Sequence, residues 1–389
     1  MSCRYRWEEE ATWRGGGGEA QDTGGEDKSE RHLKSPAEDV SFLESLTLKF
    51  QSLVSMRGPW PSRAWAVGAS FALALSTLLA RLLLQRNEEH RRRRTQLAVA
   101  LLKTRNKLMH DPESIRKARA FKPKPKDVFI STYPKCGTTW VMQIVHAIKS
   151  NADMNFGEIT EKLPWDVLAH QCHQDLDAPQ DILPRAFKSH ETWATIPKGG
   201  RYIYVARDPI DAFYSFYLFL PAYLGLDSDD ITPDAFADAL FSGASESGQI
   251  WQHFLGWYKA RHEADILWVF FEDLKEDLGR EVVRIADWLD IDLDDELLRE
   301  VVRVSSYNFM SAPENVHHFD DHFVRAHVMP RMFLPANLPS RVSKVRVGGG
   351  SRRSLPARLR TELEQRWSEL MLPETGFASY SSFRASFRV

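Results

Sequence analysis

Short apolar segments that alternate with helical patterns constrain the fold of this chain more than any other feature. Each segment is six residues long and rich in β-branched or aromatic side chains, which is typical of buried strands. These predicted strands are 127–132, 201–206 and 266–271. Predicted helices follow them, over 138–150, from Pro209 onward and up to Leu289. Strands that alternate with helices favour a parallel sheet covered on both faces, so we predict a three-layer α/β fold.

The first 120 residues lie outside this alternating pattern. Residues 1–62 combine acidic side chains with runs of glycine, and they cannot bury enough apolar surface to offset the entropy of ordering. We therefore predict a disordered tail there, and we assign the α/β domain to residues 121–389.

A stretch with few charges follows the predicted tail. We predict a transmembrane helix over 63–85, because 64–84 is about as long as a bilayer span and is uncharged up to Arg81. A buried or amphipathic helix is the alternative, since the stretch is rich in alanine. Residues 86–120 are interpreted as a basic juxtamembrane helical linker. This excess of arginine after the span predicts a membrane-anchored protein whose domain faces the cytosol, with a soluble cytoplasmic protein as the alternative.

Charge and cysteine content exclude several classes of function. The formal net charge is -2, so we expect no nucleic-acid partner. The three cysteines, Cys3, Cys136 and Cys172, have no paired spacing, which argues against a disulfide framework and a zinc site. We expect no metal.

The loop after the first predicted strand has the composition of an anion-binding site. Gly137 permits a tight turn whose backbone N–H groups can point at a phosphate, and Lys135 adds a positive charge. Thr138 and Thr139 add hydroxyl donors, and Trp140 offers a flat face for a base. The lysine precedes the glycine, unlike in the common nucleotide loop, and a generic strand-to-helix turn is the alternative.

Two further segments carry candidate site residues. Arg207 follows the second predicted strand and can grip a phosphate through two parallel hydrogen bonds, with Ser215 in the next helix. Lys188 and His190 lie between the two phosphate elements in the sequence, and histidine has the pKa of a base near neutral pH. Trp165 is an aromatic candidate for an acceptor pocket or, equally, a core residue.

Several of these segments resemble the cytosolic sulfotransferase family, over roughly residues 121–376. Residues 133–140 are similar to its 5′-phosphosulfate loop, 201–219 to its 3′-phosphate strand and helix, and 187–190 to its catalytic Lys-Thr-His. The family usually has Ser where this chain has Cys136 and Lys where it has Val347.

The resemblance implies an enzyme that uses 3′-phosphoadenosine 5′-phosphosulfate (PAPS) as co-substrate and a small, lipophilic hydroxyl or amine acceptor. It implies that His190, Lys135 and Lys188 are catalytic and that Trp165 contacts the acceptor. The PAPS-binding residues that it implies are Lys135, Cys136, Gly137, Thr138, Thr139, Trp140, Arg207, Ser215, Phe271, Ser305, Tyr307, Arg346, Val347 and Gly348.

Two other functions stay open from the residues alone. A nucleotide-dependent kinase would use Lys135 on a triphosphate, and it would need a magnesium-binding acid such as Asp208 or Asp273. A non-catalytic, membrane-tethered PAPS-binding protein would not need a base such as His190. The acceptor and the oligomeric state stay open as well.

Overall fold

The computed structural model describes residues 62–263, 265–339, 342–345 and 354–387, without side-chain detail at 62–69, 71, 72 and 228. The chain forms two units, Met1–Arg94 and Thr95–Val389, which we treat separately. The predicted disordered tail lies outside the described residues, except for its last residue.

The described residues of the first unit belong to helix α2, which spans Ser62–Met109 and continues into the second unit. None of the described helices is long and apolar enough to cross a membrane. The predicted transmembrane helix over 63–85, and with it the membrane contact through 64–84, is therefore not supported. Arg81, Arg86 and the arginines from Arg91 to Arg94 continue in the same helix, so the apolar stretch does not stand apart from the basic one.

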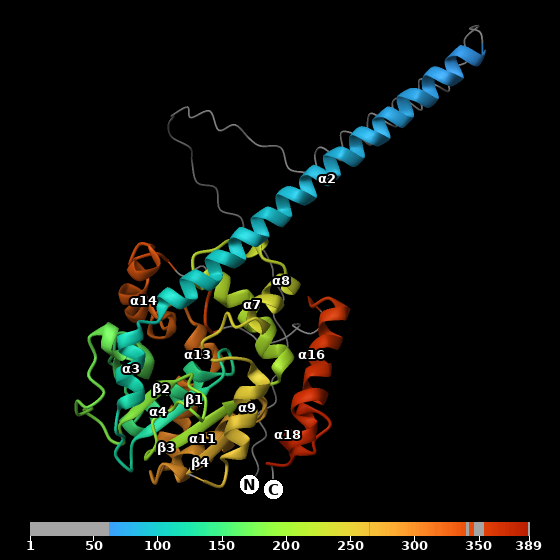
Figure 1. The fold of residues 1–389 in the computed structure, drawn as a ribbon. Helices are drawn as coiled ribbons and strands as arrows, with labels where there is room; N and C mark the ends of the chain where they lie inside the picture. Colours follow the sequence, from blue (N-terminus) through green and yellow to red (C-terminus); the bar gives the residue numbers. More distant parts are fainter. Residues whose placement is uncertain (1–61, 264, 340–341, 346–353, 388–389) are drawn as a thin grey trace, which may run out of the picture. The chain divides into compact units, whose positions relative to one another are not determined.

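The second unit is built around a four-stranded parallel sheet (Figure 1). The strands are β1 (Val128–Thr132), β2 (Ala186–Ser189), β3 (Arg201–Ala206) and β4 (Ile266–Phe270), in the order β2-β1-β3-β4. All residues of β1 and β2 are buried, as expected of parallel strands covered on both faces. The prediction of a parallel α/β sheet is confirmed.

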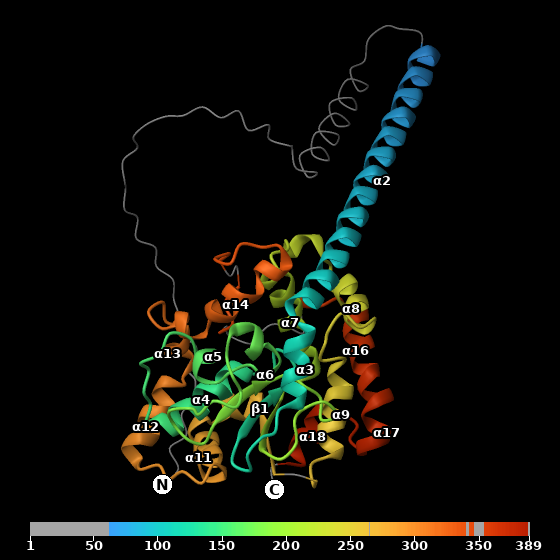
Figure 2. The same ribbon diagram turned by 60° about the vertical axis from the view of Figure 1, so that its left-hand side comes forward.

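Side chains that alternate along the strands divide the core into two layers, one on each face of the sheet. Phe129, Tyr202, Tyr204 and Phe270 belong to one layer, and Ile130, Ile203 and Val205 belong to the other. Helices α7 (Pro209–Tyr223), α9 (Ile250–Lys259) and α16 (Ala357–Leu370) supply buried residues to the first layer. Helices α4 (Thr138–Ser150), α11 (Leu278–Trp288) and α12 (Asp295–Val304) supply buried residues to the second. Figures 1 and 2 show where these helices lie.

Shorter helices complete the second unit, which begins at Thr95 and thus includes residues that precede Phe121. The α-helices are α3 (Pro112–Ala120), α5 (Ile159–Lys162), α6 (Asp166–Ala169), α8 (Pro233–Phe241), α10 (Phe271–Glu276), α13 (Tyr307–Ser311), α14 (His322–Val328), α17 (Leu372–Thr375) and α18 (Tyr380–Ala385). The 3₁₀ turns are His170–Cys172, Ser228–Asp230, Val316–Phe319 and Pro330–Met332.

The register of the sheet brings the carboxyl ends of its strands to one edge. Ser131 of β1 is opposite Ser189 of β2, and Thr132 is opposite Val205 of β3. Ala206 is in turn opposite Phe270 of β4. The segments that follow the strands therefore emerge side by side, at the edge where open α/β sheets bind ligands.

Candidate functional site

The loop between β1 and α4 has the backbone of a tight anion-binding turn. Lys135 and Gly137 have φ values of 70° and 110°, and Gly137 is the N-cap residue of α4. A Cβ atom at Gly137 would lie 2.9 Å from Cδ2 of Phe271. Glycine is therefore required at this position by both the backbone angle and the neighbouring ring. The N-terminal N–H groups of α4 follow directly, and such groups attract anions.

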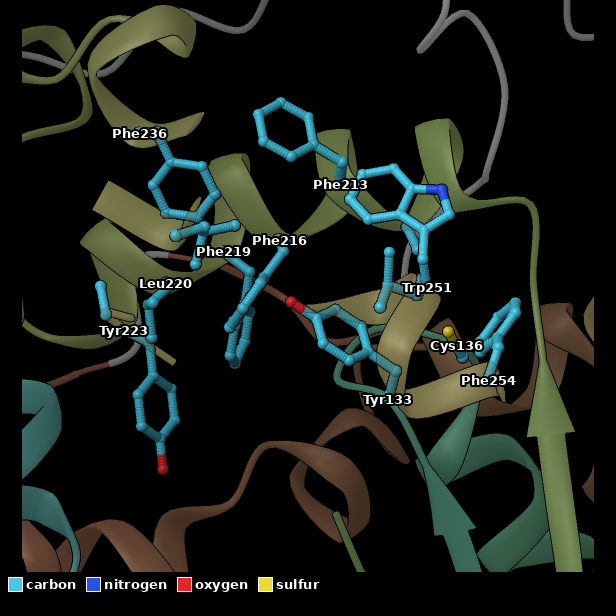
Figure 3. Close-up of a cluster of buried hydrophobic side chains, with 14 of the residues drawn as sticks. Tyr133, Cys136, Phe213, Phe216, Phe219, Leu220, Tyr223, Phe236, Trp251 and Phe254 are labelled. Carbon is cyan, nitrogen blue, oxygen red and sulfur yellow. The ribbon is translucent and has the colours of Figure 1, made fainter. Parts of the chain in front are cut away.

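The side chains of Thr132, Cys136 and Thr138, in the loop and at its two ends, are buried. The Oγ1 atoms of Thr132 and Thr138 share a hydrogen bond of 2.6 Å, which ties the end of β1 to the first turn of α4. Cys136 is fully buried near Tyr133, Trp251 and Phe254 (Figure 3). Burial raises the pKa of the Cys136 thiol, so it is neither a nucleophile nor a redox-reactive thiolate at neutral pH.

Trp140 connects the loop to a distant segment. Its Nε1–H donates to the carbonyl oxygen of Ser305 at 2.7 Å, and its ring meets the ring of Phe271 edge-on at 5.4 Å. Tyr307 starts helix α13 two residues after Ser305 and is half-buried. The structure thus brings Trp140, Phe271 and the segment 305–307 together, although they are far apart in the sequence.

Arg207 leaves the end of β3 and lies against the loop between β1 and α4. Its Nη1 donates to the carbonyl oxygen of Lys135 at 3.0 Å, and its guanidinium lies 4.2 Å from the ring centre of Phe271. Its Nε is buried and has no hydrogen-bond partner among the described residues. Ser215 follows two turns into α7 and is half-buried. Arg207 therefore keeps donor capacity beside the loop.

His190 follows β2 and is oriented by the end of β1. Its Nδ1 lies 2.8 Å from the carbonyl oxygen of Thr132 and 3.2 Å from Oγ1 of the same residue. Burial, and then the positive charge of Lys188, lower the pKa of His190 well below its usual value. The imidazole is therefore neutral at neutral pH.

Lys188 and Lys135 both rest on aromatic rings. Lys188 Nζ lies 3.5 Å from the ring centre of Trp165, and Trp165 meets His190 edge-on at 5.0 Å. Burial, followed by the charge of Lys344, lowers the pKa of Lys188 to about 7. Lys135 Nζ lies 3.7 Å from the ring centre of Phe219 in α7. Trp165 is thus brought beside His190 and Lys188.

A second histidine, His253, which was not predicted from the sequence, lies behind His190. Nε2 of His253 lies 3.2 Å from the carbonyl oxygen of His190, and the Tyr204 hydroxyl lies 2.8 Å from Nδ1 of His253. Because a carbonyl can only accept, Nε2 carries the proton and the Tyr204 hydroxyl donates to Nδ1. Burial lowers the pKa of His253 to about 4, so this neutral ring supports the backbone of His190. Its position in an apolar helix face provided no local signal of this contact.

An ion pair also missed from the sequence supports the next residue. Arg119 of α3 donates to the Glu191 carboxylate at 2.7 Å, and the carbonyl oxygen of Glu191 accepts from Ser131 Oγ at 3.2 Å. Segment 112–120, which the sequence analysis placed in a linker, therefore contributes to the support of the site.

Some predicted site residues lie outside the described part of the chain. These are Arg346, Val347 and Gly348 of the late glycine-rich loop. Among the described residues, no group of three or more His, Cys, Asp or Glu side chains is arranged to hold a metal ion.

The chain is similar in sequence to known sulfotransferases. A model of the sulfotransferase domain matches residues 125–327, about half of the chain. Amine sulfotransferase of Oryctolagus cuniculus is 31% identical over 189 residues, which cover 47% of this chain and 62% of that protein. Sulfotransferase 2B1 of Mus musculus is 32% identical over 190 residues, which cover 46% of this chain and 55% of that protein. The matched segments span less than two thirds of these two relatives.

Solved structures share the fold at lower identity. Mouse sulfotransferase SULT7A1 complexed with PAP aligns with a TM-score of 0.52 and 19% identity, over 72% of this chain and 95% of that chain. Retinol dehydratase in complex with androsterone and inactive cofactor PAP aligns with a TM-score of 0.54 and 17% identity, over 68% of this chain and 86% of that chain. Because the sulfotransferase domain matches the region that holds the β1–α4 loop, Arg207 and His190, this chain belongs to the sulfotransferase family.

Proposed function

We propose that this chain transfers a sulfuryl group from PAPS to a hydroxyl or amine of a small, lipophilic acceptor. The observation that carries the proposal is the orientation of His190, whose Nδ1 lies 2.8 Å from the Thr132 carbonyl oxygen. A carbonyl oxygen accepts only, so Nδ1 holds the proton and Nε2 keeps the lone pair that a base needs. This base lies at the strand edge that also carries the phosphate loop and Arg207.

The residues at this edge fit a nucleotide with phosphates at both ends. The loop offers helix N-terminal N–H groups, and Arg207 offers a buried Nε without a partner among the described residues. The buried Ser305 Oγ also has no partner in the described part of the chain. We assign PAPS binding to Lys135, Cys136, Gly137, Thr138, Thr139, Trp140, Arg207, Ser215, Phe271, Ser305 and Tyr307, and by resemblance to Arg346, Val347 and Gly348.

In the proposed reaction, the acceptor oxygen or nitrogen attacks sulfur while the bond from sulfur to the 5′-phosphate oxygen breaks. His190 Nε2 takes the acceptor proton, and the bonding electrons leave with the phosphate. Positive charge from Lys135 and Lys188 stabilises the departing phosphate, because negative charge develops on its oxygen as the bond to sulfur breaks, and it also attracts the anionic oxygens of the sulfuryl group. The lowered pKa of His190 keeps the base unprotonated at neutral pH.

The aromatic surroundings of the base support a lipophilic acceptor. Trp165 lies edge-on to His190 and under Lys188, so an acceptor that reaches Nε2 would contact an indole ring. The related protein from Oryctolagus cuniculus is an amine sulfotransferase, and the structure of retinol dehydratase contains androsterone. We therefore propose that flat or polycyclic alcohols and amines are the compounds to test first.

A paired donor assay tests the proposed function. The purified full chain is incubated with [³⁵S]PAPS or with [γ-³²P]ATP, each with a panel of phenols, sterols and lipophilic amines. We expect label transfer from PAPS only. Transfer from ATP would indicate a kinase, and binding of PAP without transfer to any acceptor would indicate a non-catalytic PAPS-binding protein. Either outcome would contradict the proposal.

A further inference from the structure

A tyrosine and a histidine behind the base form a buried polar pair in the core. The Oη atom of Tyr204 in β3 lies 2.8 Å from Nδ1 of His253 in α9, and both residues are 0% exposed. Polar groups in an apolar core are unfavourable unless their hydrogen bonds are satisfied. Two apolar side chains would fill the same space without that requirement, so packing alone does not account for the pair.

The hydrogen bonds of this pair run in one direction. Nε2 of His253 lies 3.2 Å from the carbonyl oxygen of His190, and a carbonyl accepts only. Nε2 of His253 therefore holds the proton, and its Nδ1 accepts from the Tyr204 hydroxyl. His190 has the opposite tautomer, with its proton on Nδ1 toward the Thr132 carbonyl oxygen. The pair thus donates to the backbone of the base and not to its ring.

Segments from two further strands hold the ring of His253. It stacks on the ring of Tyr204 with 5.7 Å between ring centres, and it meets Tyr133, which follows β1, edge-on at 5.8 Å. The Tyr133 hydroxyl in turn donates to the carbonyl oxygen of Gly248 at 3.3 Å. Because these contacts fix the ring on two sides, its Nε2–H is directed at the His190 carbonyl oxygen in one orientation.

The same face of α9 holds the next carbonyl group. Trp257, one helical turn further along α9, donates from Nε1 to the carbonyl oxygen of Glu191 at 3.4 Å. Ser131 Oγ of β1 donates to the same oxygen at 3.2 Å. Strand β2 ends at Ser189, so the strand ladder does not extend to His190 and Glu191. Side-chain donors therefore replace the ladder as the restraint on this part of the backbone.

We infer that His253 is a positioning residue that holds the base of the transfer reaction in its productive tautomer. By fixing the His190 carbonyl oxygen, it keeps the imidazole within hydrogen-bond distance of the Thr132 carbonyl oxygen. Without that contact, a neutral imidazole can also carry its proton on Nε2, and the ring then has no lone pair there for the acceptor proton. The inference rests on the proposed function, because it concerns the base of that reaction.

The first measurement is the tautomer of His190 in the full chain, which requires no turnover. Histidine labelled with ¹⁵N distinguishes a protonated ring nitrogen from an unprotonated one by NMR, and His190→Asn identifies the His190 signals. We expect the wild type to hold the proton on Nδ1 at neutral pH. His253→Met removes the donor and should give a mixture of the two tautomers. His253→Gln, with a side chain of similar length, keeps a terminal N–H donor and should retain the wild-type tautomer.

Turnover is the second measurement. His253→Met should lower kcat by about tenfold or more, because a small displacement of a reacting group is costly in rate. His253→Gln should stay within about threefold of the wild type. The Kd for PAP should change by less than about twofold in both variants, because the hydrogen bonds of His253 reach the base and not the residues assigned to PAPS.

Two controls separate positioning from stability. His253→Met leaves the buried Tyr204 hydroxyl without its partner and should lower the stability to urea, whereas Tyr204→Phe combined with His253→Met removes both polar groups and should regain much of it. The double variant should still be slow and of mixed tautomer. His146→Met removes a comparable bond, because Nε2 of buried His146 in α4 lies 3.1 Å from the Asp153 carbonyl oxygen. It should lower stability and leave kcat and the His190 tautomer unchanged.

An unchanged His190 tautomer in His253→Met would overturn the inference. So would a His253→Gln variant as slow as His253→Met, or a double variant whose rate recovers with its stability. If His253→Met does not fold, the double variant, in which no Tyr204 hydroxyl is left unpaired, replaces it in the comparison with His253→Gln. Absence of label transfer from PAPS in the wild type would instead refute the proposed function, and the tautomer comparison would still decide the role of His253.

Discussion

Nδ1 of His190 lies 2.8 Å from the backbone carbonyl oxygen of Thr132, across the edge where β1 and β2 end. Because the carbonyl can only accept, this contact selects the tautomer with the proton on Nδ1. The contact leaves Nε2 as the acceptor of a ring that lies edge-on to Trp165.

Replacing His190 should slow the sulfuryl transfer step and leave nucleotide binding unchanged. Asparagine can still donate toward the Thr132 carbonyl but cannot take a proton, so His190→Asn should lower kcat by about two to four decades. The Kd for PAP should change by less than about twofold. Single-turnover rates and equilibrium PAP binding measure the two effects, and His262→Asn, at an exposed position, is the control. Near-normal turnover with an alcohol of high pKa would mean that another group is the base.

The pH dependence of kcat should reflect the depressed pKa of His190. Burial and Lys188 lower this pKa, so the base is neutral above it and is lost only as the pH falls through it. We expect the acid limb of the kcat profile to have its midpoint below pH 6.5, about the ordinary pKa of histidine. Measuring kcat from pH 5 to 7, with an acceptor that does not titrate there, checks this. In Lys188→Met the acid limb of the residual activity should move to higher pH, because the positive charge that helps to lower the pKa of His190 is gone.

Arg207 should discriminate nucleotides by their 3′-phosphate. A charge-assisted hydrogen bond contributes about 1.5–3 kcal/mol, so Arg207→Ala should weaken PAP by one to two decades. Binding of adenosine 5′-phosphate should weaken much less, although some loss is expected because Arg207 also holds the Lys135 carbonyl oxygen. Calorimetric titration of both nucleotides gives the difference. Equal losses would show that Arg207 supports the loop without contacting the 3′-phosphate.

A buried ion pair at the amino-terminal end of β1 and β2 should stabilise the fold without contributing to sulfuryl transfer. Arg185 donates to Asp127 through Nε at 2.9 Å and Nη2 at 2.5 Å, and both side chains are 3% exposed. Arg185→Met leaves Asp127 buried without its counter-charge and should cost about 3–5 kcal/mol in the free energy of unfolding. Arg303→Met, which breaks the exposed pair with Glu300, should cost at most about 1 kcal/mol in the same urea titration. Equal costs would contradict this account.

Local sequence patterns determined the parts of the structure that depend on neighbouring residues. The helix 138–150 was predicted with the bounds that α4 has, because an apolar strand, a glycine turn and a helical pattern follow one another there. Pro209 marked the start of α7 for a similar reason, since proline fits the first turn and Asp208 caps the helix. The predicted transmembrane helix over 63–85 is not supported, because none of the described helices is apolar enough over a sufficient length, and Arg81 and the arginines beyond it continue in the same helix.

The sequence by itself thus determined the parallel α/β core and the candidate loop, Arg207 and His190, because each follows a strand and parallel strands end at one edge. Only the tertiary structure decided what surrounds them. His253 behind His190 and Arg119 beside Glu191 come from elements far apart in the chain. Their contacts arise from helix packing and long-range burial, and neither hydrophobic periodicity nor motif spacing encodes which distant side chain will support His190 or pair with Glu191.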